Sequence, residues 1–490
     1  MLKLYLFAFA VLLSAFVFSQ PIRLSPQNPH YFSYKGKPLV LITSAEHYGA
    51  VINSAFDYKT YVDVLQKNNF NLTRIFVGSY VEGNALDFAP ALKSTEGDNQ
   101  NTMAVRYGKL IAPWARSDSA GYINGGNKFD LDKWDEKYFE RLKEFCALAA
   151  KKNVIVEVVL FSANYGPALW KNSPLNAKNN INGIEEVAYN ETHLPKNEKL
   201  AARQKAMVRK IVTELNAFDN IYFELCNEPY WIKGIPEVEA SIKVQQFLPE
   251  TDEWQKLIGN VIKETEQKLP KKHLVAQNYA NTYYKIEKMD SNVSVLNFHY
   301  AFPPKTVTDN YKWNLPVSFD ETSDGQNAPD RRREAWAFIM EGGAVYNNLD
   351  WSYANDDATG MGRNLLGKRQ SGKEVRDQLN ILAKTINSFD FIKAIPLDNN
   401  YRQELPDEIS IHGLGIKGKD YIVYFLKNKP VQVDQWSMLL PQGNYALKWI
   451  DPVDGRVIKQ EKFLNTGNKK EIKIPSFSDD LLLRVTTTNK

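Results

Sequence analysis

The chain has 490 residues, more than one average domain needs, and its 61 basic and 57 acidic residues nearly balance. No block of lysine or arginine stands out, which argues against nucleic acid as a main partner. With 43% hydrophobic and 24% charged residues, the composition is that of a folded protein and excludes a fibrous or largely disordered chain. Two cysteines, Cys146 and Cys226, are too few for a disulfide scaffold and argue against a cysteine metal cluster.

Residues 1–20 read MLKLYLFAFAVLLSAFVFSQ, one lysine followed by an apolar run that ends near the small residue Ser19. This pattern is typical of a signal peptide, and no basic stop-transfer cluster follows it. A membrane anchor is the alternative, but the run is short for a span. We therefore expect a secreted or periplasmic protein with no membrane association after signal removal.

Apolar runs of strand length recur along the chain and alternate with longer amphipathic segments. This alternation predicts repeated βα units and a parallel sheet that is buried on both faces. Eight such runs occur, at 38–44, 72–77, 154–161, 221–225, 273–277, 293–298, 315–320 and 344–351.

Helical periodicity lies between most of these runs. Eight strands with interleaved helices predict an α/β fold, a (β/α)8 TIM barrel over residues 21–392. The helix between strands five and six, around 283–288, has the weakest pattern. The other predicted helices are 58–67, 131–152, 199–215, 253–269, 331–340 and 373–387.

From about residue 395 the pattern changes to short alternating runs such as DYIVYFL and NYALKWI, separated by turn formers as in DPVDGR. No helical period persists there. Residues 393–490 are therefore predicted to form a small C-terminal antiparallel β-sandwich domain.

Two carboxylates follow predicted strands, Glu228 in the segment IYFELCNEPYW after strand four and Glu321 in PVSFDETSDG after strand seven. In a barrel both belong to the C-terminal rim, on opposite walls of one cleft. Two facing carboxyls suit glycoside hydrolysis, one protonating the departing oxygen and the other attacking the anomeric carbon. Asp320 lies next to Glu321, and the sequence leaves the register of strand seven open.

Further residues lie where such a site needs them, and we predict that they contact substrate or the two carboxylates. Asn227 is a candidate donor to the sugar 2-hydroxyl, and Pro229 fixes the backbone after Glu228. Arg74 lies within strand two, where a buried guanidinium needs an anionic partner. The remaining candidates are Glu46, His47 and Tyr48 after strand one, Trp231 in the fourth loop, His299 and Tyr300 at the end of strand six, and Trp351 at the end of strand eight.

Taken together, these residues resemble the clan A glycoside hydrolases, the retaining (β/α)8 enzymes, and in particular the cellulase-like family 5 type. The resemblance spans residues 38–387 and implies Glu228 as acid/base, Glu321 as nucleophile, a β-linked glycan as substrate and no cofactor. Family 5 commonly has a histidine after strand three, where this chain has LFSANYG, and His47 is a candidate for a similar role. The C-terminal segments YIVYFL, YALKWIDPVDGR and FSDDLLLRV are similar to the β-sandwich of apiosidase-like, family 140 type hydrolases. Packing against the barrel is the expected role of that domain, and sugar binding is the alternative.

The function predicted from the sequence is a secreted retaining β-glycoside hydrolase acting on a poly- or oligosaccharide. A catalytically inactive barrel that only binds glycan is the alternative, but a pure binder has no need of a spaced acid and nucleophile. A metal-dependent hydrolase is a third reading, although the six histidines form no His-x-His or His-Glu-x-x-His motif. The sequence does not distinguish endo from exo action, name the sugar or indicate the oligomeric state.

Overall fold

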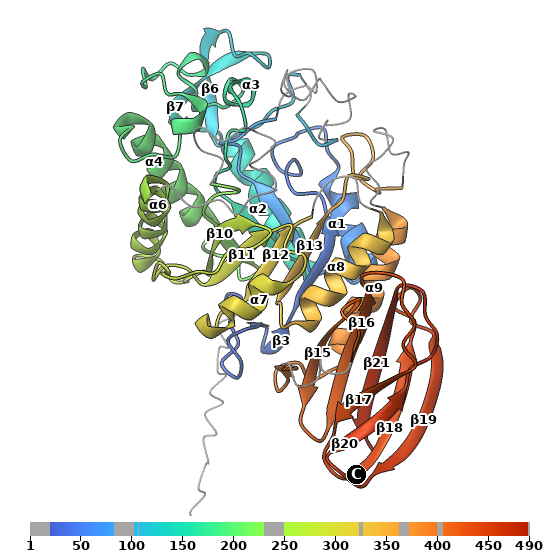
Figure 1. The fold of residues 1–490 in the computed structure, drawn as a ribbon. Helices are drawn as coiled ribbons and strands as arrows, with labels where there is room; N and C mark the ends of the chain where they lie inside the picture. Colours follow the sequence, from blue (N-terminus) through green and yellow to red (C-terminus); the bar gives the residue numbers. More distant parts are fainter. Residues whose placement is uncertain are drawn as a thin grey trace, which may run out of the picture.

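A computed structural model of the protein describes residues 20–82, 102–105, 107–229, 249–322, 327–361, 372–398 and 405–488. Its largest unit is an eight-stranded sheet surrounded by helices (Figure 1). Neighbouring strands that pair in this sheet run parallel. In spatial order the strands are β4 (Leu41–Ala45), β13 (Val345–Leu349), β12 (Val317–Glu321), β11 (Val295–His299), β10 (Val275–Asn281), β9 (Ile221–Glu224), β8 (Ile155–Val159) and β5 (Leu72–Phe76).

The seam between β4 and β5 is bridged by Asn71, which comes directly before β5. Its side chain accepts from the Ile42 N–H at 2.9 Å and donates to the Val40 carbonyl at 2.8 Å. The sheet therefore closes into a barrel, and all eight strands coincide with the apolar runs predicted from the sequence. The predicted TIM barrel is confirmed.

Helices cover the outside of the barrel, and several of them begin at a capping side chain. Asp57 accepts from two backbone N–H groups at the start of α1, Asp135 does the same for α2, and Asn327 and Asp330 form a capping box at α8. The helices are α1 (Tyr58–Lys67), α2 (Glu136–Lys151), α4 (Glu198–Leu215), α6 (Pro249–Gln267), α7 (Lys305–Asn310), α8 (Ala328–Met340) and α9 (Lys373–Asn387).

Two helix predictions were wrong. The helix predicted for 131–152 begins only at Glu136, because residues 131–134 pair in a strand and Asp135 caps the helix behind them. The weak pattern at 283–288 forms no helix, and residues 282–294 connect β10 to β11 without one.

Long insertions lie over the C-terminal ends of the strands, at the top of Figure 1. After β5 the chain forms a hairpin of β6 (Trp114–Ala120) and β7 (Asn127–Trp134), and after β8 it forms the short helices α3 (Pro167–Trp170), η3 (Ala177–Asn179) and η4 (Tyr189–Glu191). The two insertions are joined by a β-bridge between Phe129 and Asn180 and by a hydrogen bond from the Tyr122 hydroxyl to the Asn172 carbonyl at 2.7 Å. They form one packed structure beside the barrel mouth.

The N-terminal part of the described chain forms a small sheet, and the C-terminal part forms a β-sandwich. The first consists of β1 (Arg23–Leu24), β2 (Phe32–Tyr34) and β3 (Lys37–Leu39).

The sandwich has a six-stranded and a two-stranded sheet. In spatial order the strands of the larger sheet are β14 (Ile395–Pro396), β15 (Ile409–Ile416), β16 (Asp420–Lys427), β21 (Asp480–Thr487), β18 (Gly443–Ile450) and β19 (Val457–Asn465); those of the smaller are β17 (Gln435–Leu439) and β20 (Lys469–Lys473).

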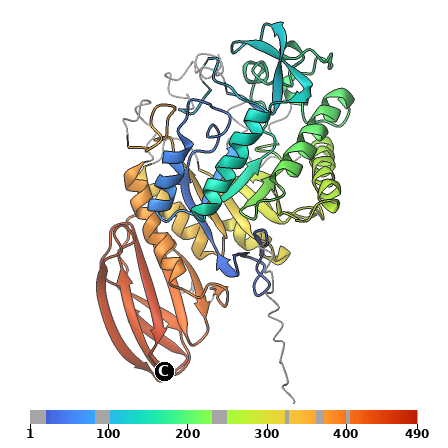
Figure 2. The same ribbon diagram turned by 180° about the vertical axis from the view of Figure 1, so that it is seen from behind.

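Side chains of β16 point alternately to the two faces of the six-stranded sheet, and both faces are buried. Val423 and Phe425 belong to the core inside the sandwich, whereas Tyr424 and Leu426 belong to the core shared with the barrel. The Tyr424 ring stacks on Trp336 of α8, with centroids 5.7 Å apart. The sandwich therefore packs against the barrel as expected, beside α8 and α9 and away from the β6–β7 hairpin, as Figure 2 also shows. Within the described ranges, no helix is both long and apolar enough to cross a membrane.

Candidate active site

Glu228 lies four residues beyond the end of β9, in a segment that is held by backbone bonds. The Asn227 N–H donates to the Phe161 carbonyl at 2.9 Å, and the Ala163 N–H donates to the Asn227 carbonyl at 2.9 Å. Glu228 itself has a φ of 47°, in the left-handed region that costs a non-glycine residue about 1–2 kcal/mol. The turn at this position brings its buried carboxylate to the barrel mouth.

Glu321 is the last residue of β12, and a bulge sets its direction. Phe298 pairs with Phe319, but the next residue of β11, His299, pairs with Glu321, so Asp320 is the extra residue on β12. A bulge of this kind re-aims side chains at the end of a strand. As a result Asp320 and Glu321 both contact Arg74, through Nε at 3.1 Å and Nη1 at 3.3 Å. This answers the register question that the sequence left open.

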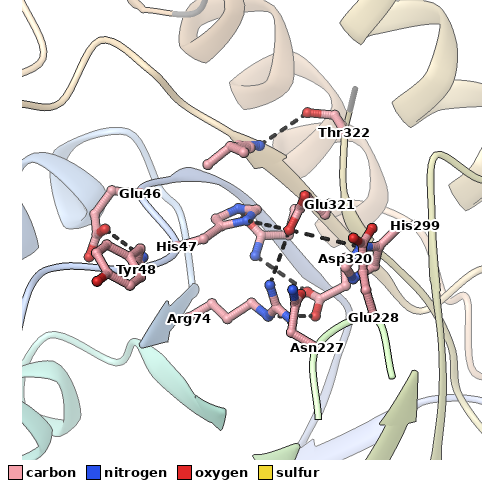
Figure 3. A network of polar contacts seen from close by, with 12 residues as sticks. Glu46, His47, Tyr48, Arg74, Asn227, Glu228, His299, Asp320, Glu321 and Thr322 are labelled. Carbon is pink, nitrogen blue, oxygen red and sulfur yellow. Dashed lines mark hydrogen bonds and ion pairs between the residues drawn. The ribbon is translucent and has the colours of Figure 1, made fainter. Parts of the chain in front are cut away.

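The two glutamates face each other across the mouth, with His299 between them (Figure 3). One carboxylate oxygen of Glu228, one of Glu321 and a ring nitrogen of His299 all lie within 4.8 Å of one another. Nδ1 of His299 is 3.0 Å from Oε1 of Glu228 and 3.8 Å from Oε2 of Glu321. The barrel thus brings together the carboxylate pair predicted from the sequence.

Arg74 of β5 is fully buried and links the strands beneath this pair. Its Nε and Nη2 donate to Oε2 of Glu224 at 2.9 and 2.6 Å, and Nη2 also donates to Oδ1 of Asn227 at 2.7 Å. Nη1 lies against Glu321. Arg74 therefore has three carboxylate partners, Glu224 and Asp320 below the site and Glu321 at its rim.

The surroundings of Glu321 keep its carboxylate ionised. Burial alone would raise the pKa of Glu321, but the charges of His299, His47 and Arg74 outweigh it and lower the pKa to about 2. The Tyr300 hydroxyl also donates to Oε1 of Glu321 at 2.9 Å. Glu321 is thus an anion with its lone pairs oriented by several donors.

Two buried carboxyls below the mouth, Glu157 and Glu224, have pKa values that are raised and not lowered. Burial raises the pKa of Glu157 on β8, and the charges of Asp320 and Glu224 raise it further. Burial also raises the pKa of Glu224, although the charge of Arg74 opposes the effect. A raised pKa of Glu157 favours its neutral form, so the Arg74 guanidinium has fewer negative charges to balance inside the barrel.

Asn227 is oriented by its neighbours. Its Oδ1 faces Arg74, and its Nδ2 donates to the Ser162 hydroxyl at 3.2 Å and the Tyr165 hydroxyl at 2.7 Å. The amide N–H groups of Asn227 thus donate to two protein hydroxyls. To donate to a sugar hydroxyl, the amide must first release one of these partners. The sugar-binding role of Asn227 stays a prediction.

The three candidates after β4 have different environments. His47 enters the site, with Nδ1 3.8 Å from Oε2 of Glu321 and Nε2 2.9 Å from Oδ1 of Asn347. Glu46 instead accepts from the backbone N–H groups of the three residues 48–50, at 2.7, 2.8 and 2.8 Å. The Tyr48 hydroxyl bonds the Glu82 N–H, and its ring packs edge-on against Phe76. Glu46 and Tyr48 lie to one side of the cluster in Figure 3, and these contacts shape the loop.

Two tryptophans complete the set of predicted substrate contacts. Trp351 follows β13 and is partly exposed, and the Thr102 hydroxyl bonds its carbonyl at 3.5 Å. Its role as a surface beneath the sugar stays a prediction. Trp231 lies outside the described residues.

Sequence reasoning missed Tyr165 and Glu224. The sequence could have indicated Glu224, because a carboxylate within the buried run IYFEL requires a partner such as Arg74. Tyr165 lies in FSANYG after β8, where only the folded loop shows that its hydroxyl reaches Asn227.

In the part of the chain that the structure describes, two sets of side chains have donor atoms close enough for a metal ion. One is Glu224, His299 and Asp320, and the other is Glu228, His299 and Glu321. The guanidinium of Arg74 contacts Glu224 and Asp320 in the first set and Glu321 in the second. A cation at either position must compete with that fixed positive charge.

No protein-family model and no curated protein matches this chain. Among solved structures it is similar to a provisionally assigned glycoside hydrolase from Bacteroides vulgatus ATCC 8482, at 13% identity and a TM-score of 0.66, over 96% of this chain and 83% of that chain. It is also similar to a glycoside hydrolase family 5 structure from the same strain, at 12% identity and a TM-score of 0.59, over 96% and 94% of the two chains. A third structure, named only glycoside hydrolase, has 11% identity and a TM-score of 0.58 over 96% and 98%. At these identities the likeness shows the fold.

Proposed function

We propose that this protein is a retaining glycoside hydrolase that cleaves a β-linked poly- or oligosaccharide. The observation that carries the proposal is the approach of the Glu228 and Glu321 carboxylate oxygens to within 4.8 Å. So short a gap between their nearest oxygens is compatible with the carboxyl separation of about 5–5.5 Å in retaining enzymes, whereas inverting enzymes need roughly 6.5–9.5 Å to admit a water molecule. The likeness to glycoside hydrolase structures supports this choice among the many chemistries of the barrel fold.

Glu321 is the proposed nucleophile, because its environment holds it ionised and the guanidinium of Arg74 contacts it directly. Glu228 is the proposed acid/base, since it faces Glu321 from the segment after β9 and its carboxylate is held by Nδ1 of His299 at 3.0 Å. In the first step Glu321 attacks the anomeric carbon while Glu228 gives its proton to the departing glycosidic oxygen. In the second step Glu228 takes a proton from water, which attacks the same carbon and releases Glu321.

A substrate screen tests the activity. The purified protein is incubated with aryl β-glycosides and β-linked polysaccharides, with Glu321→Gln as a parallel sample. Cleavage by the wild type and loss of cleavage in the variant are expected. A glycan that binds without being cleaved would instead support the inactive binding barrel.

Export of the chain is a second part of the proposal, and it rests on the signal-like pattern of residues 1–20. The expected product in the medium or periplasm begins near residue 21. Intact-mass measurement of the exported protein tests this, and a mature chain that still carries residues 1–20 would contradict it.

A further inference from the structure

Arg376, in the first turn of α9, binds the residues on both sides of Trp351. Its Nη1 donates to Oδ2 of Asp350 at 2.8 Å and to Oγ of Ser352 at 2.9 Å. Its Nη2 donates to the Gly360 carbonyl at 2.7 Å, further along the same connection between β13 and α9. The Arg376 and Asp350 side chains are only 2% and 0% exposed. One buried guanidinium therefore joins two points of this connection.

Asp350 is itself anchored to the first strand of the barrel, β4. Its N–H donates to the Ala45 carbonyl at 2.9 Å, and the Ser44 hydroxyl donates to its Oδ2 at 2.8 Å. The other carboxylate oxygen, Oδ1, accepts from the N–H and the hydroxyl of Ser352 at 3.0 and 2.6 Å. These contacts connect the turn that contains Trp351 to both β4 and α9.

The position of Arg376 is unfavourable unless these contacts are made. A cation in the first turn of a helix is opposed by the helix dipole, and a buried guanidinium without an anionic partner is costly. The connection also approaches the guanidinium closely, because a Cβ added at Gly360 would lie 2.8 Å from Nη1 of Arg376. The φ of 62° at Gly360 favours glycine as well. Both features fit a guanidinium whose role is to hold this connection in place.

We infer that Arg376 is a positioning residue that sets the place of Trp351 at the barrel mouth. The inference rests on the proposed function and on the predicted contact of Trp351 with the sugar. Arg376 belongs to a helix on the outside of the barrel, so its effect on substrate passes through the residues that it holds. Glu321 has contacts from Arg74 and Tyr300, which come from other strands. Loss of Arg376 should therefore weaken substrate binding and leave the chemical step almost unchanged.

The test is a double-mutant cycle between Arg376→Lys and Trp351→Ala in the full chain. Lysine keeps the charge, but an ammonium group lacks the fork of donors that reaches Asp350, Ser352 and Gly360 together. Each single variant is expected to raise KM roughly 3- to 10-fold, about the effect of one aromatic contact, with kcat within about 3-fold of the wild type. In the Trp351→Ala background, Arg376→Lys should raise KM less than about 2-fold, because residues that act as a unit are not additive.

Arg332→Lys is the matched control. Arg332 forms a buried pair with Asp480 in which both side chains are 3% exposed, but this pair lies between α8 and the sandwich. The same substitution at this position should leave KM at the wild-type value. The inference is wrong if Arg376→Lys or Trp351→Ala alone leaves KM unchanged, or if their effects multiply in full.

A milder variant is needed if Arg376→Lys does not fold. Ser352→Ala removes the hydroxyl that accepts from Nη1 of Arg376 and donates to Asp350. It takes the place of Arg376→Lys in the cycle, and the same lack of additivity with Trp351→Ala is expected.

Crystal structures test the inference without turnover. In Arg376→Lys we expect residues 350–353 to be displaced or to have two conformations, with the wild-type arrangement in Arg332→Lys. The same arrangement of these residues in all three proteins would overturn the inference. If the wild type cleaves no glycoside, the proposed function fails, and the structures still show whether Arg376 holds Trp351 in place.

Discussion

The carboxylates of Glu228 and Glu321, from the ends of β9 and β12, bring oxygen atoms to within 4.8 Å of each other. The His299 imidazole lies between them and contacts both. Burial lowers the pKa of His299, but the charges of Glu321 and Glu228 and its hydrogen bond to Glu228 outweigh this and raise it. The positive charge of this imidazole makes the close approach of two carboxylates electrostatically possible.

Replacing the proposed nucleophile should abolish turnover. Glu321→Gln keeps the shape of the side chain but offers no anion to attack the anomeric carbon, so kcat should fall by roughly 10⁴- to 10⁶-fold. Hydrolysis rates on the best substrate of the screen measure the effect, and glycan binding by calorimetry should persist. Activity within tenfold of the wild type would place the nucleophile elsewhere.

Loss of the acid/base should depend on the leaving group. Glu228→Ala is expected to retain far more activity on a dinitrophenyl glycoside than on an alkyl glycoside, because only the second needs protonation. Azide should accelerate the variant and give a glycosyl azide, since a small anion needs no general base to attack the intermediate. Equal losses on both substrates, with no azide product, would remove Glu228 from this role.

The acid limb of the pH–rate profile should respond to His47. The attacking carboxylate must be ionised, and the pKa of Glu321 is about 2 because its cationic neighbours outweigh burial. The charge of His47 favours the Glu321 anion, so His47→Gln should raise the pKa of Glu321 and move the acid limb upward by about one pH unit. The measurement is kcat/KM from pH 2.5 to 6, with circular dichroism to verify folding. An acid limb that stays in place or moves to lower pH would contradict this.

The low pKa of Glu321 also makes the stability of the folded protein depend on pH. The Glu321 pKa in the folded state lies below the value of about 4.3 typical of an unfolded chain. Its contribution to stability is therefore fully present above that value and is lost as the pH falls toward 2. His47→Gln should weaken this contribution, so the acid unfolding midpoint should move to higher pH.

A buried ion pair links the barrel to the sandwich. Arg332 of α8 donates from Nε and Nη2 to the Asp480 carboxylate at 2.7 and 3.0 Å, and both side chains are only 3% exposed. Asp480→Ala leaves the guanidinium buried without its counter-ion and should cost about 3–5 kcal/mol in the free energy of unfolding. Urea denaturation measures the loss.

The neighbouring residue supplies the control. Asp479 pairs with Arg333 at 2.7 Å, but its side chain is 49% exposed. Asp479→Ala should therefore cost less than about 1 kcal/mol. Similar losses for the two variants would mean that burial of the Arg332 pair has no special effect.

The sequence was sufficient to predict the barrel and to predict that Glu228 and Glu321 meet at its rim. Parallel strands covered on both faces read as continuous apolar runs, and residues just beyond strands four and seven of a barrel must reach the same rim. The start of α2 was misplaced because Leu131 and Trp134 continue the apolar pattern of the helix backward through β7.

Contacts made by loops were beyond sequence reasoning. The Glu46 carboxylate accepts from the backbone of its own loop, which no spacing rule reveals, and its predicted contact with substrate stays a prediction. Tyr165 was missed because its position depends on how the chain turns after β8. Asp320 and Glu321 both face Arg74 only because of the bulge in β12.

The most direct test of the central claim is to trap the covalent intermediate. The protein is treated with 2-deoxy-2-fluoroglycosyl fluorides of the sugars identified by the screen, digested, and analysed by mass spectrometry. A retaining mechanism with Glu321 as nucleophile predicts a fluorosugar adduct on Glu321, with activity lost in proportion to labelling. An adduct on another residue, or turnover with inversion at the anomeric carbon and no adduct, would contradict the account.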